Sequence, residues 1–141
     1  MADLLDTFNI AASGLSAERV RMQTVAANLA NARTTRTAAG GPYRRQVPIF
    51  ESAPVDPFGS ELDRAIGRVE VTGVRSDNAP PVMVYDPSHP DADANGYVQY
   101  PDINILQEMV DMMSTSRTYD ANASVVDTTN SMALRALEIG K

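Results

Sequence analysis

The run INILQEMVDMMSTSRTYDANASVVDTTNSMALRALEI, which spans Ile103 to Ile139, decides the fold because it contains neither proline nor glycine. Stepping alternately by four and three residues from Ile105 to Leu137 meets mostly apolar side chains. A repeat of 3.5 residues sustained over four heptads or more is typical of a helix with a coiled-coil seam. The sequence therefore predicts one C-terminal helix that is much longer than the usual globular helix of about 11–12 residues.

The N-terminal segment carries the same repeat. Between Leu4 and Ala32 it contains no proline and one glycine, Gly14, and its stepped positions are apolar apart from Glu18. Both seams include many small or polar residues, and alanine contributes much less on burial than the roughly 1.5–3 kcal/mol of a leucine. Two such helices are therefore expected to be marginal on their own in water.

The stepped positions, together with nearby asparagines, form the predicted helix or subunit interface. Within one subunit, side chains of the first helix are expected to face side chains of the second. The predicted interface residues are Leu4, Phe8, Leu15, Met22, Val25, Asn28, Leu29 and Asn31 on the first helix and Met109, Met112, Tyr119, Asn122, Val126 and Leu137 on the second.

Asn28 and Asn31 stand three residues apart near the predicted end of the first helix. Asparagine at such a place either caps and terminates the helix or hydrogen-bonds across a helix–helix contact and fixes its register. The sequence leaves both roles open for both residues.

The central region, from Arg33 to Asp102, contains all nine prolines and most of the glycines. Turn signals such as Asn95-Gly96 separate short stretches that are rich in valine and tyrosine. The sequence predicts a small sheet or a pair of hairpins here. The predicted strands are Arg44 to Phe50, Arg68 to Val74, Val82 to Tyr85 and Tyr97 to Tyr100, with loops at Arg33 to Ala39 and Glu51 to Ala65.

Apolar residues also lie off the seams. Leu106, Val110 and Met113 form a second stripe at helical spacing on the C-terminal segment. Either this stripe packs against the central region, or neighbouring subunits cover it. The second alternative leads to the hypothesis that the terminal helices become fully ordered only on assembly.

Charge is divided along the chain. Arginines without any acid occupy Arg19 to Arg45, whereas acids dominate from Asp77 to Asp127, and the formal net charge is −6. A molecule with opposite signs on different faces favours head-to-tail self-assembly or a complementary partner. Arg36, Arg44 and Arg45 are the predicted inter-subunit charge contacts.

The composition argues against an enzyme. Cysteine is absent and His89 is the single histidine, which removes thiolate chemistry and metal sites rich in cysteine or histidine. Nucleic-acid binding is not favoured, because lysine is nearly absent and acids outnumber basic residues. No run of 18 apolar residues occurs, and Asp3 and Asp6 stand where a cleavable signal would carry basic residues. We therefore expect no catalytic residue, cofactor, metal or small-molecule substrate.

The segment from Asp91 to Asp102 has the oxygen-ligand spacing of an EF-hand calcium loop, with Gly96 at its sixth position. Its context contradicts that interpretation, because Pro90 and Pro101 stand where the flanking helices should end and begin. An Asn-Gly pair before a short strand is also an ordinary turn signal. A calcium-responsive binding module therefore stays only as an alternative function.

Several motifs resemble a known family. Ser13-Gly-Leu-Ser-Ala-Glu-Arg19 and Ala26-Ala-Asn-Leu-Ala-Asn-Ala32 resemble the N-terminal signature of bacterial flagellar rod and hook proteins. Glu108-Met-Val-Asp-Met112 and Ser116-Arg-Thr-Tyr-Asp-Ala-Asn122 resemble the C-terminal signature of the same class. The stretch from Tyr85 to Val98 resembles the proximal-rod members of that family in particular.

The resemblance implies a mainly α fold with a small β region. In that family the terminal helices form an antiparallel coiled coil, here residues 1–33 and 103–141, beside a central strand and loop domain, here residues 34–102. It further implies a structural subunit of the proximal rod of the flagellar basal body, which polymerises through its terminal helices into a tube that crosses the periplasm.

The partners implied by the resemblance are other proximal-rod subunits, further copies of this chain, the adaptor between rod and membrane ring, and the distal rod protein. Export would use the flagellar type III apparatus without a cleaved signal peptide. A helical adaptor that does not polymerise is the other alternative function, beside the calcium module.

Overall fold

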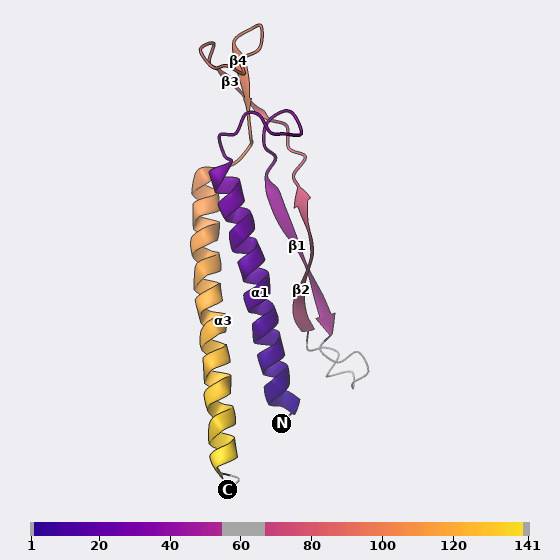
Figure 1. Cartoon of the computed structure of the whole chain (residues 1–141), viewed down its shortest axis with the longest axis vertical. Coiled ribbons are helices and arrows are strands. Elements are labelled where there is room, and N and C mark those ends of the chain that lie inside the picture. Colours follow the sequence, from indigo (N-terminus) through magenta and orange to yellow (C-terminus); the bar gives the residue numbers. More distant parts are fainter. Residues whose placement is uncertain (1, 55–66, 140–141) are drawn as a thin grey trace.

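The computed structural model describes residues 2–54 and 67–139, and its main body is a pair of long helices. Helix α1 (Ala2–Ala30) and helix α3 (Ile105–Ile139) lie side by side and run in opposite directions, as Figure 1 shows. The two predicted helices are therefore present, and the prediction of a mainly α chain with a small β region is confirmed.

Two antiparallel hairpins make up the β region. Strands β1 (Gln46–Pro54) and β2 (Gly67–Ser76) run along α1, so that α1 lies between α3 and this hairpin in the elongated molecule of Figure 1. Strands β3 (Val82–Tyr85) and β4 (Tyr97–Tyr100) form a second hairpin beyond the helix ends.

Helix α1 ends where Asn31 turns the chain. The Asn31 backbone N–H donates to the Ala27 carbonyl at 3.0 Å, and the side-chain Nδ2 donates to the same oxygen at 2.9 Å. The Thr34 hydroxyl in turn donates to Asn31 Oδ1 at 3.1 Å. These bonds satisfy a carbonyl that a helix end would otherwise leave free, and the helix stops shortly before the predicted end at Ala32.

Helix α3 begins with Asn104 as its N-cap. The Asn104 Oδ1 accepts a hydrogen bond from the Gln107 N–H at 3.2 Å, and the Asn104 carbonyl accepts one from the Glu108 N–H at 3.0 Å. A side-chain oxygen in this role satisfies one of the free N–H groups at a helix start. Glu108 also brings a negative charge to the first turn, where the helix dipole favours it.

Strands β1 and β2 pair along their whole length, with a register shift between Ile49 and Phe50 that marks a β-bulge. The prediction of a loop starting at Glu51 is wrong, because residues 51–54 continue β1 and pair with β2. The rest of that predicted loop, residues 55–65, lies outside the described residues.

Ser13 attaches this hairpin to α1. Its Oγ accepts a hydrogen bond from the Val69 N–H at 3.2 Å and donates to the Ile10 carbonyl at 2.7 Å. A helix side chain thus takes the place of a missing strand neighbour for β2, which holds the hairpin against the helix pair.

The predicted strands Val82–Tyr85 and Tyr97–Tyr100 are confirmed to the residue. The rings of Tyr85 and Tyr97 lie edge to face, with their centroids 5.3 Å apart. Gly96 ends the connecting loop with a φ of +80°, which glycine adopts without strain. A Cβ on Gly96 would also meet the Tyr85 ring at 2.9 Å, so the close packing of the hairpin needs a glycine there.

The apolar core of the described residues is small. Its largely hidden side chains are Ala11, Ala17, Val25, Ala32 and Val98, most of them alanines. The chain exposes 9858 Å², whereas a compact monomer of 15.2 kDa is expected to expose about 7100 Å². The subunit by itself therefore leaves much of its surface in water. No described helix has the length and apolar character that a membrane crossing requires.

Candidate functional site

A group of buried and half-buried polar residues meets where α1, β1 and α3 converge. Asn28 in the last turn of α1 and Glu108 in the first turn of α3 are each 1% exposed. Tyr43, Arg45 and Gln46 come from the connection after α1 and the start of β1. We call these five residues the polar joint.

Asn28 uses its whole side-chain amide within the joint. Its Nδ2 donates to the Gln46 carbonyl at 2.9 Å and to Glu108 Oε2 at 3.1 Å. Its Oδ1 accepts from the Gln46 N–H at 2.8 Å and from the Tyr43 hydroxyl at 3.1 Å. Asn28 therefore crosses from α1 to α3 and also pairs with β1, whereas Asn31 bonds only to the chain around the end of α1.

Glu108 is a buried carboxylate with a cation beside it. Its Oε1 accepts a hydrogen bond from Arg45 Nε at 2.6 Å, and the Arg45 side chain is 31% exposed. Both carboxylate oxygens are thus used, one by Arg45 and one by Asn28. Removing one partner of a buried ion pair typically costs roughly 3–5 kcal/mol, because the other charge stays buried without compensation.

Burial raises the pKa of the Tyr43 hydroxyl, and the negative charge of Glu108 raises that pKa further. The hydroxyl therefore keeps its proton at neutral pH, and it donates that proton to Asn28 Oδ1. The ionisation state of Tyr43 and the hydrogen bonding of the joint are consistent with each other.

Below the joint, small and polar residues alternate with larger apolar ones along the contact between α1 and α3. A Cβ on Gly14 would lie 2.9 Å from Asn122 Nδ2, so the helices come close together at this point. Gly14 and Asn28 are two heptads apart, and so are Asn122 and Glu108 opposite them. The two contacts therefore share one antiparallel register. The buried and half-buried stripe of α3 on this side comprises Glu108, Met112, Thr115, Tyr119, Asn122, Val126, Thr129 and Ala133.

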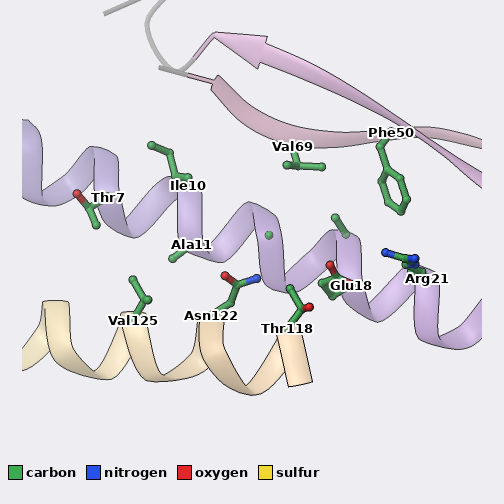
Figure 2. A pocket seen from close by; sticks show the side chains of 12 residues that line it. Thr7, Ile10, Ala11, Glu18, Arg21, Phe50, Val69, Thr118, Asn122 and Val125 are labelled. Carbon is green, nitrogen blue, oxygen red and sulfur yellow. The ribbon is translucent and has the colours of Figure 1, made fainter. Parts of the chain in front are cut away.

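A cavity of about 570 Å³ lies between α1, α3 and the β1–β2 hairpin. Figure 2 shows Ala11 and Val125 pointing toward one another from the two helices, while Phe50 and Val69 reach in from the strands. Glu18, which also lines this cavity, has its Oε2 buried without a hydrogen-bond partner. The three elements are therefore not closely packed here in the isolated subunit.

In its first turns, α3 is apolar on the face that is turned away from α1. Leu106 is 75% exposed, Val110 and Met113 are each 58% exposed, and Met109 beside them is 49% exposed. Residues three and four apart are neighbours on a helix surface, so these four side chains form one continuous surface, which we call the outer stripe. Thr115 on the opposite face is fully buried.

A second apolar surface lies at the far end of the helix pair, where α1 begins and α3 ends. Leu5 is 65% exposed there, and Phe8, Leu134 and Leu137 are exposed as well. We call these four residues the end patch. The outer stripe and the end patch therefore lie near opposite ends of one long helix pair.

The structure divides the predicted interface residues among three environments. Val25 and Asn28 are buried, whereas Phe8, Met109 and Leu137 are exposed. The side chain of Leu4 lies outside the described residues. The half-buried remainder comprises Leu15, Met22, Leu29, Asn31, Met112, Tyr119, Asn122 and Val126.

The three predicted charge contacts also differ. Arg45 is engaged inside the chain by Glu108. Arg44 is exposed, and its Nη1 donates to Asn78 Oδ1 at 3.1 Å. The Arg36 side chain is 79% exposed and lies 3.8 Å from Asp91. Only Arg36 and Arg44 are therefore placed to reach a neighbouring molecule.

Two aspartates of the segment with calcium-loop spacing are engaged in hydrogen bonds within the chain, Asp93 inside its own loop and Asp91 with the connection after α1. The Asp93 Oδ1 accepts from the backbone N–H groups of Asn95 at 2.8 Å and Tyr97 at 2.9 Å. The Asp91 Oδ2 accepts from the Thr35 hydroxyl at 2.8 Å. In the part of the chain that the structure describes, no group of three acidic, histidine or cysteine side chains is placed to hold a metal ion.

The sequence analysis did not identify Tyr43, Gln46 or Glu108 as members of a site, nor Gly14 as the point of close approach. Two signals were available. Gly14 is the single glycine in a segment that otherwise favours a helix, and Glu108 is an acid within an apolar run. No local pattern marks Tyr43 or Gln46, because they meet Asn28 only in the folded chain.

Family models match both ends of the chain. One described as "Flagella basal body rod protein" covers residues 8–36, and one described as "Flagellar basal body rod FlgEFG protein C-terminal" covers residues 94–139. The flagellar basal-body rod protein FlgC of Borreliella burgdorferi is 42% identical, over 96% of this chain and 97% of its own length.

Two further relatives carry the same name. The FlgC protein of Bacillus subtilis is 41% identical over 96% of this chain and 97% of its own length. The FlgC protein of Salmonella typhimurium is 42% identical over 98% of both chains. The similarity thus extends through the central hairpins as well as the helices.

Proposed function

We propose that neighbouring rod subunits cover the outer stripe and the end patch of this chain, which belongs to the flagellar basal-body rod protein C family. The chain is a structural subunit of the proximal rod rather than an enzyme. The distribution of apolar side chains carries this proposal. The outer stripe exposes Leu106, Val110 and Met113, whereas the contact between α1 and α3 buries Glu108 and Thr115.

Burial of the outer stripe would supply a large driving force. A leucine, valine or methionine gains roughly 1.5–3 kcal/mol when its side chain is fully removed from water. Contiguous exposed apolar surface on a soluble protein typically marks an interaction site. The outer stripe and the end patch consist of different residues and lie at opposite ends of the helix pair. A contact between the outer stripe of one subunit and the end patch of another is therefore heterologous, and such contacts generate open assemblies when they do not close into a ring.

We also propose that α1 and α3 form an antiparallel coiled coil, and that residues 1–33 and 103–141 act as one core with residues 34–102 as an outer region. The shared register at Gly14–Asn122 and Asn28–Glu108, two heptads apart, supports the coiled coil. At the first of these contacts, Gly14 leaves room for the Asn122 side chain between the helices.

The proposed partners are other proximal-rod subunits, further copies of this chain, the adaptor that joins the rod to the membrane ring, and the distal rod protein. The proposed place is the periplasmic part of the basal body, reached through the flagellar type III apparatus without cleavage of a signal. The names of the relatives and the resemblance of the motifs support these statements. Exposed Arg36 and Arg44 are proposed to contact acids on a neighbour.

The gene encoding this chain can be deleted and then restored on a plasmid. We expect the deletion strain to be non-motile, with basal bodies that lack a complete rod and a hook in electron micrographs, and the plasmid to restore both. Complete rods and hooks in the deletion strain would contradict the proposed function. Deletion of the gene for a filament cap protein serves as a control, because rods and hooks are then expected to form normally.

A further inference from the structure

The small residues in the contact between α1 and α3 offer little steric basis for one register. Gly14 has no side chain, and Thr115 and Thr129 on the facing stripe of α3 are small. A slide of one heptad moves the helices by about 10 Å. It would place Thr115 instead of Asn122 opposite Gly14, and neither residue is too large for that space.

Charge pairing between the helices would favour a different register. Arg21 precedes Asn28 by one heptad on α1. The same slide that brings Thr115 to Gly14 would bring the Glu108 carboxylate opposite Arg21, which carries the opposite charge. Neither small-residue packing nor charge pairing along the helices alone therefore selects the observed register.

We propose that the polar joint is the register lock of this helix pair, with Asn28 and Arg45 as its positioning residues. Asn28 pairs with both the N–H and the carbonyl of Gln46, and this holds the adjacent Arg45 in place relative to α1. Asn28 Nδ2 and Arg45 Nε then present two donors to one carboxylate, and each oxygen of Glu108 accepts a hydrogen bond from one of them.

Sliding the helices by one heptad breaks both of these bonds at once. Glu108 is 1% exposed, so its carboxylate would have to find new donors or become hydrated. A polar residue at a single seam position is known to specify register in coiled coils at some cost in stability. Here the lock also includes the start of β1, so the helix register and the attachment of the β1–β2 hairpin are set together.

The lock determines how the two apolar surfaces are offset. The outer stripe belongs to α3, whereas Leu5 and Phe8 of the end patch belong to α1. A slide of one heptad changes the distance between them along the helix pair by about 10 Å. The inference concerns the fold of one subunit and does not depend on the proposed contacts in the rod.

The absence of cysteine allows a direct test by disulfide trapping in the full-length chain. The pair Gly14→Cys with Asn122→Cys reports the observed register. The pair Gly14→Cys with Thr115→Cys, in a chain that also carries Asn122→Ala so that the new Cβ at position 14 meets no collision, reports the slide of one heptad. Intramolecular disulfides are counted by mass spectrometry after mild oxidation. With the joint intact, we expect the first pair to form at least tenfold more disulfide than the second.

Asn28→Leu and Arg45→Met are each expected to reduce that ratio at least tenfold while helical circular dichroism is kept. Adding Arg21→Ala to Asn28→Leu should lower the yield of the 14–115 pair again, because the competing partner of Glu108 is removed. Asn31→Leu is the matched control, since Asn31 bonds only around the end of α1, and it should leave the ratio unchanged.

An unchanged ratio in both Asn28→Leu and Arg45→Met would overturn the proposal. A loss of helical circular dichroism in both variants would overturn it as well, because the joint would then be needed for the helices to pair at all rather than for their register.

Discussion

Near its start, helix α3 differs from an ordinary amphipathic helix in how its two faces are used. The face that packs on α1 presents Glu108, Thr115 and Asn122, whereas the face that looks away presents Leu106, Val110 and Met113. A helix of a free-standing globular protein directs its apolar stripe toward its own core. The comparison shows that the contact within this subunit includes buried polar groups, whereas large apolar side chains at the start of α3 stay exposed.

The largest effect is expected from a charge in the outer stripe. Val110→Asp should abolish motility, because a carboxylate buried without a partner at a subunit contact costs several kcal/mol. The fold should survive, since Val110 is 58% exposed and contacts little within the chain. Swimming assays and circular dichroism of the purified variant measure the two effects separately. Gln107→Asp places the same charge at an exposed polar position in the same turn and should leave swimming largely intact.

The next largest effect concerns the opposite face. Arg45→Met should lower the free energy of unfolding by about 3 kcal/mol, because the buried Glu108 carboxylate loses its cation. Urea titration monitored by circular dichroism measures the change. The matched variant Arg44→Met removes an exposed arginine that bonds to Asn78, and it should change the free energy of unfolding by less than about 0.5 kcal/mol. Equal effects of the two substitutions would remove the distinction between the joint and the surface.

The close approach of the helices can be tested at Gly14. A Cβ there would lie 2.9 Å from the end of the Asn122 side chain. Gly14→Leu should therefore push the helices apart and destabilise the fold by about 2 kcal/mol. Gly14→Ala combined with Asn122→Ala removes the collision and gains helix propensity, so this double variant should be as stable as the natural chain or more so. Destabilisation of the double variant by 2 kcal/mol would contradict a purely steric role for Gly14.

The smallest effect is the change in stability that is expected when Tyr43 ionises at alkaline pH. Its folded-state pKa is raised above the ordinary value of 10.0, so its contribution to stability is complete below that value and is lost as the pH rises through the folded-state pKa. Between about pH 9 and pH 11 the natural chain should therefore lose more stability than Tyr43→Phe, which lacks this ionisable hydroxyl. Urea titrations of both proteins at the two pH values measure the difference. Parallel losses would mean that Tyr43 is solvated in the folded chain.

The sequence was sufficient to predict most of the secondary structure. The segment 103–139 has no proline or glycine that would interrupt a long helix, and the Asn95-Gly96 turn signal stands directly before β4. The extension of β1 to Pro54 was missed, because residues 51–54 gain their strand structure from pairing with β2 rather than from their own pattern.

The seam between the helices could be predicted only in part. The stepped positions and the observed stripe of α3 share Met112, Tyr119, Val126 and Ala133. The positions between them differ by one residue, as with Met109 and Glu108, although Asn122 was itself among the predicted interface residues. The hypothesis assigned the larger apolar side chain to the contact within the subunit. The chain instead places Glu108 there, because Arg45 and Asn28 compensate its charge. These residues are so far apart in the sequence that no local pattern could have predicted their contact.

Thiol labelling at two positions of α3 tests the contrast between its faces most directly. Because the natural chain has no cysteine, Val110→Cys and Thr115→Cys each introduce a single reactive group. The account predicts that position 110 reacts rapidly in the isolated subunit and becomes protected in purified basal bodies, while position 115 is protected in both. Equally rapid labelling of position 110 in assembled rods would contradict the claim that neighbouring subunits cover the apolar face of α3.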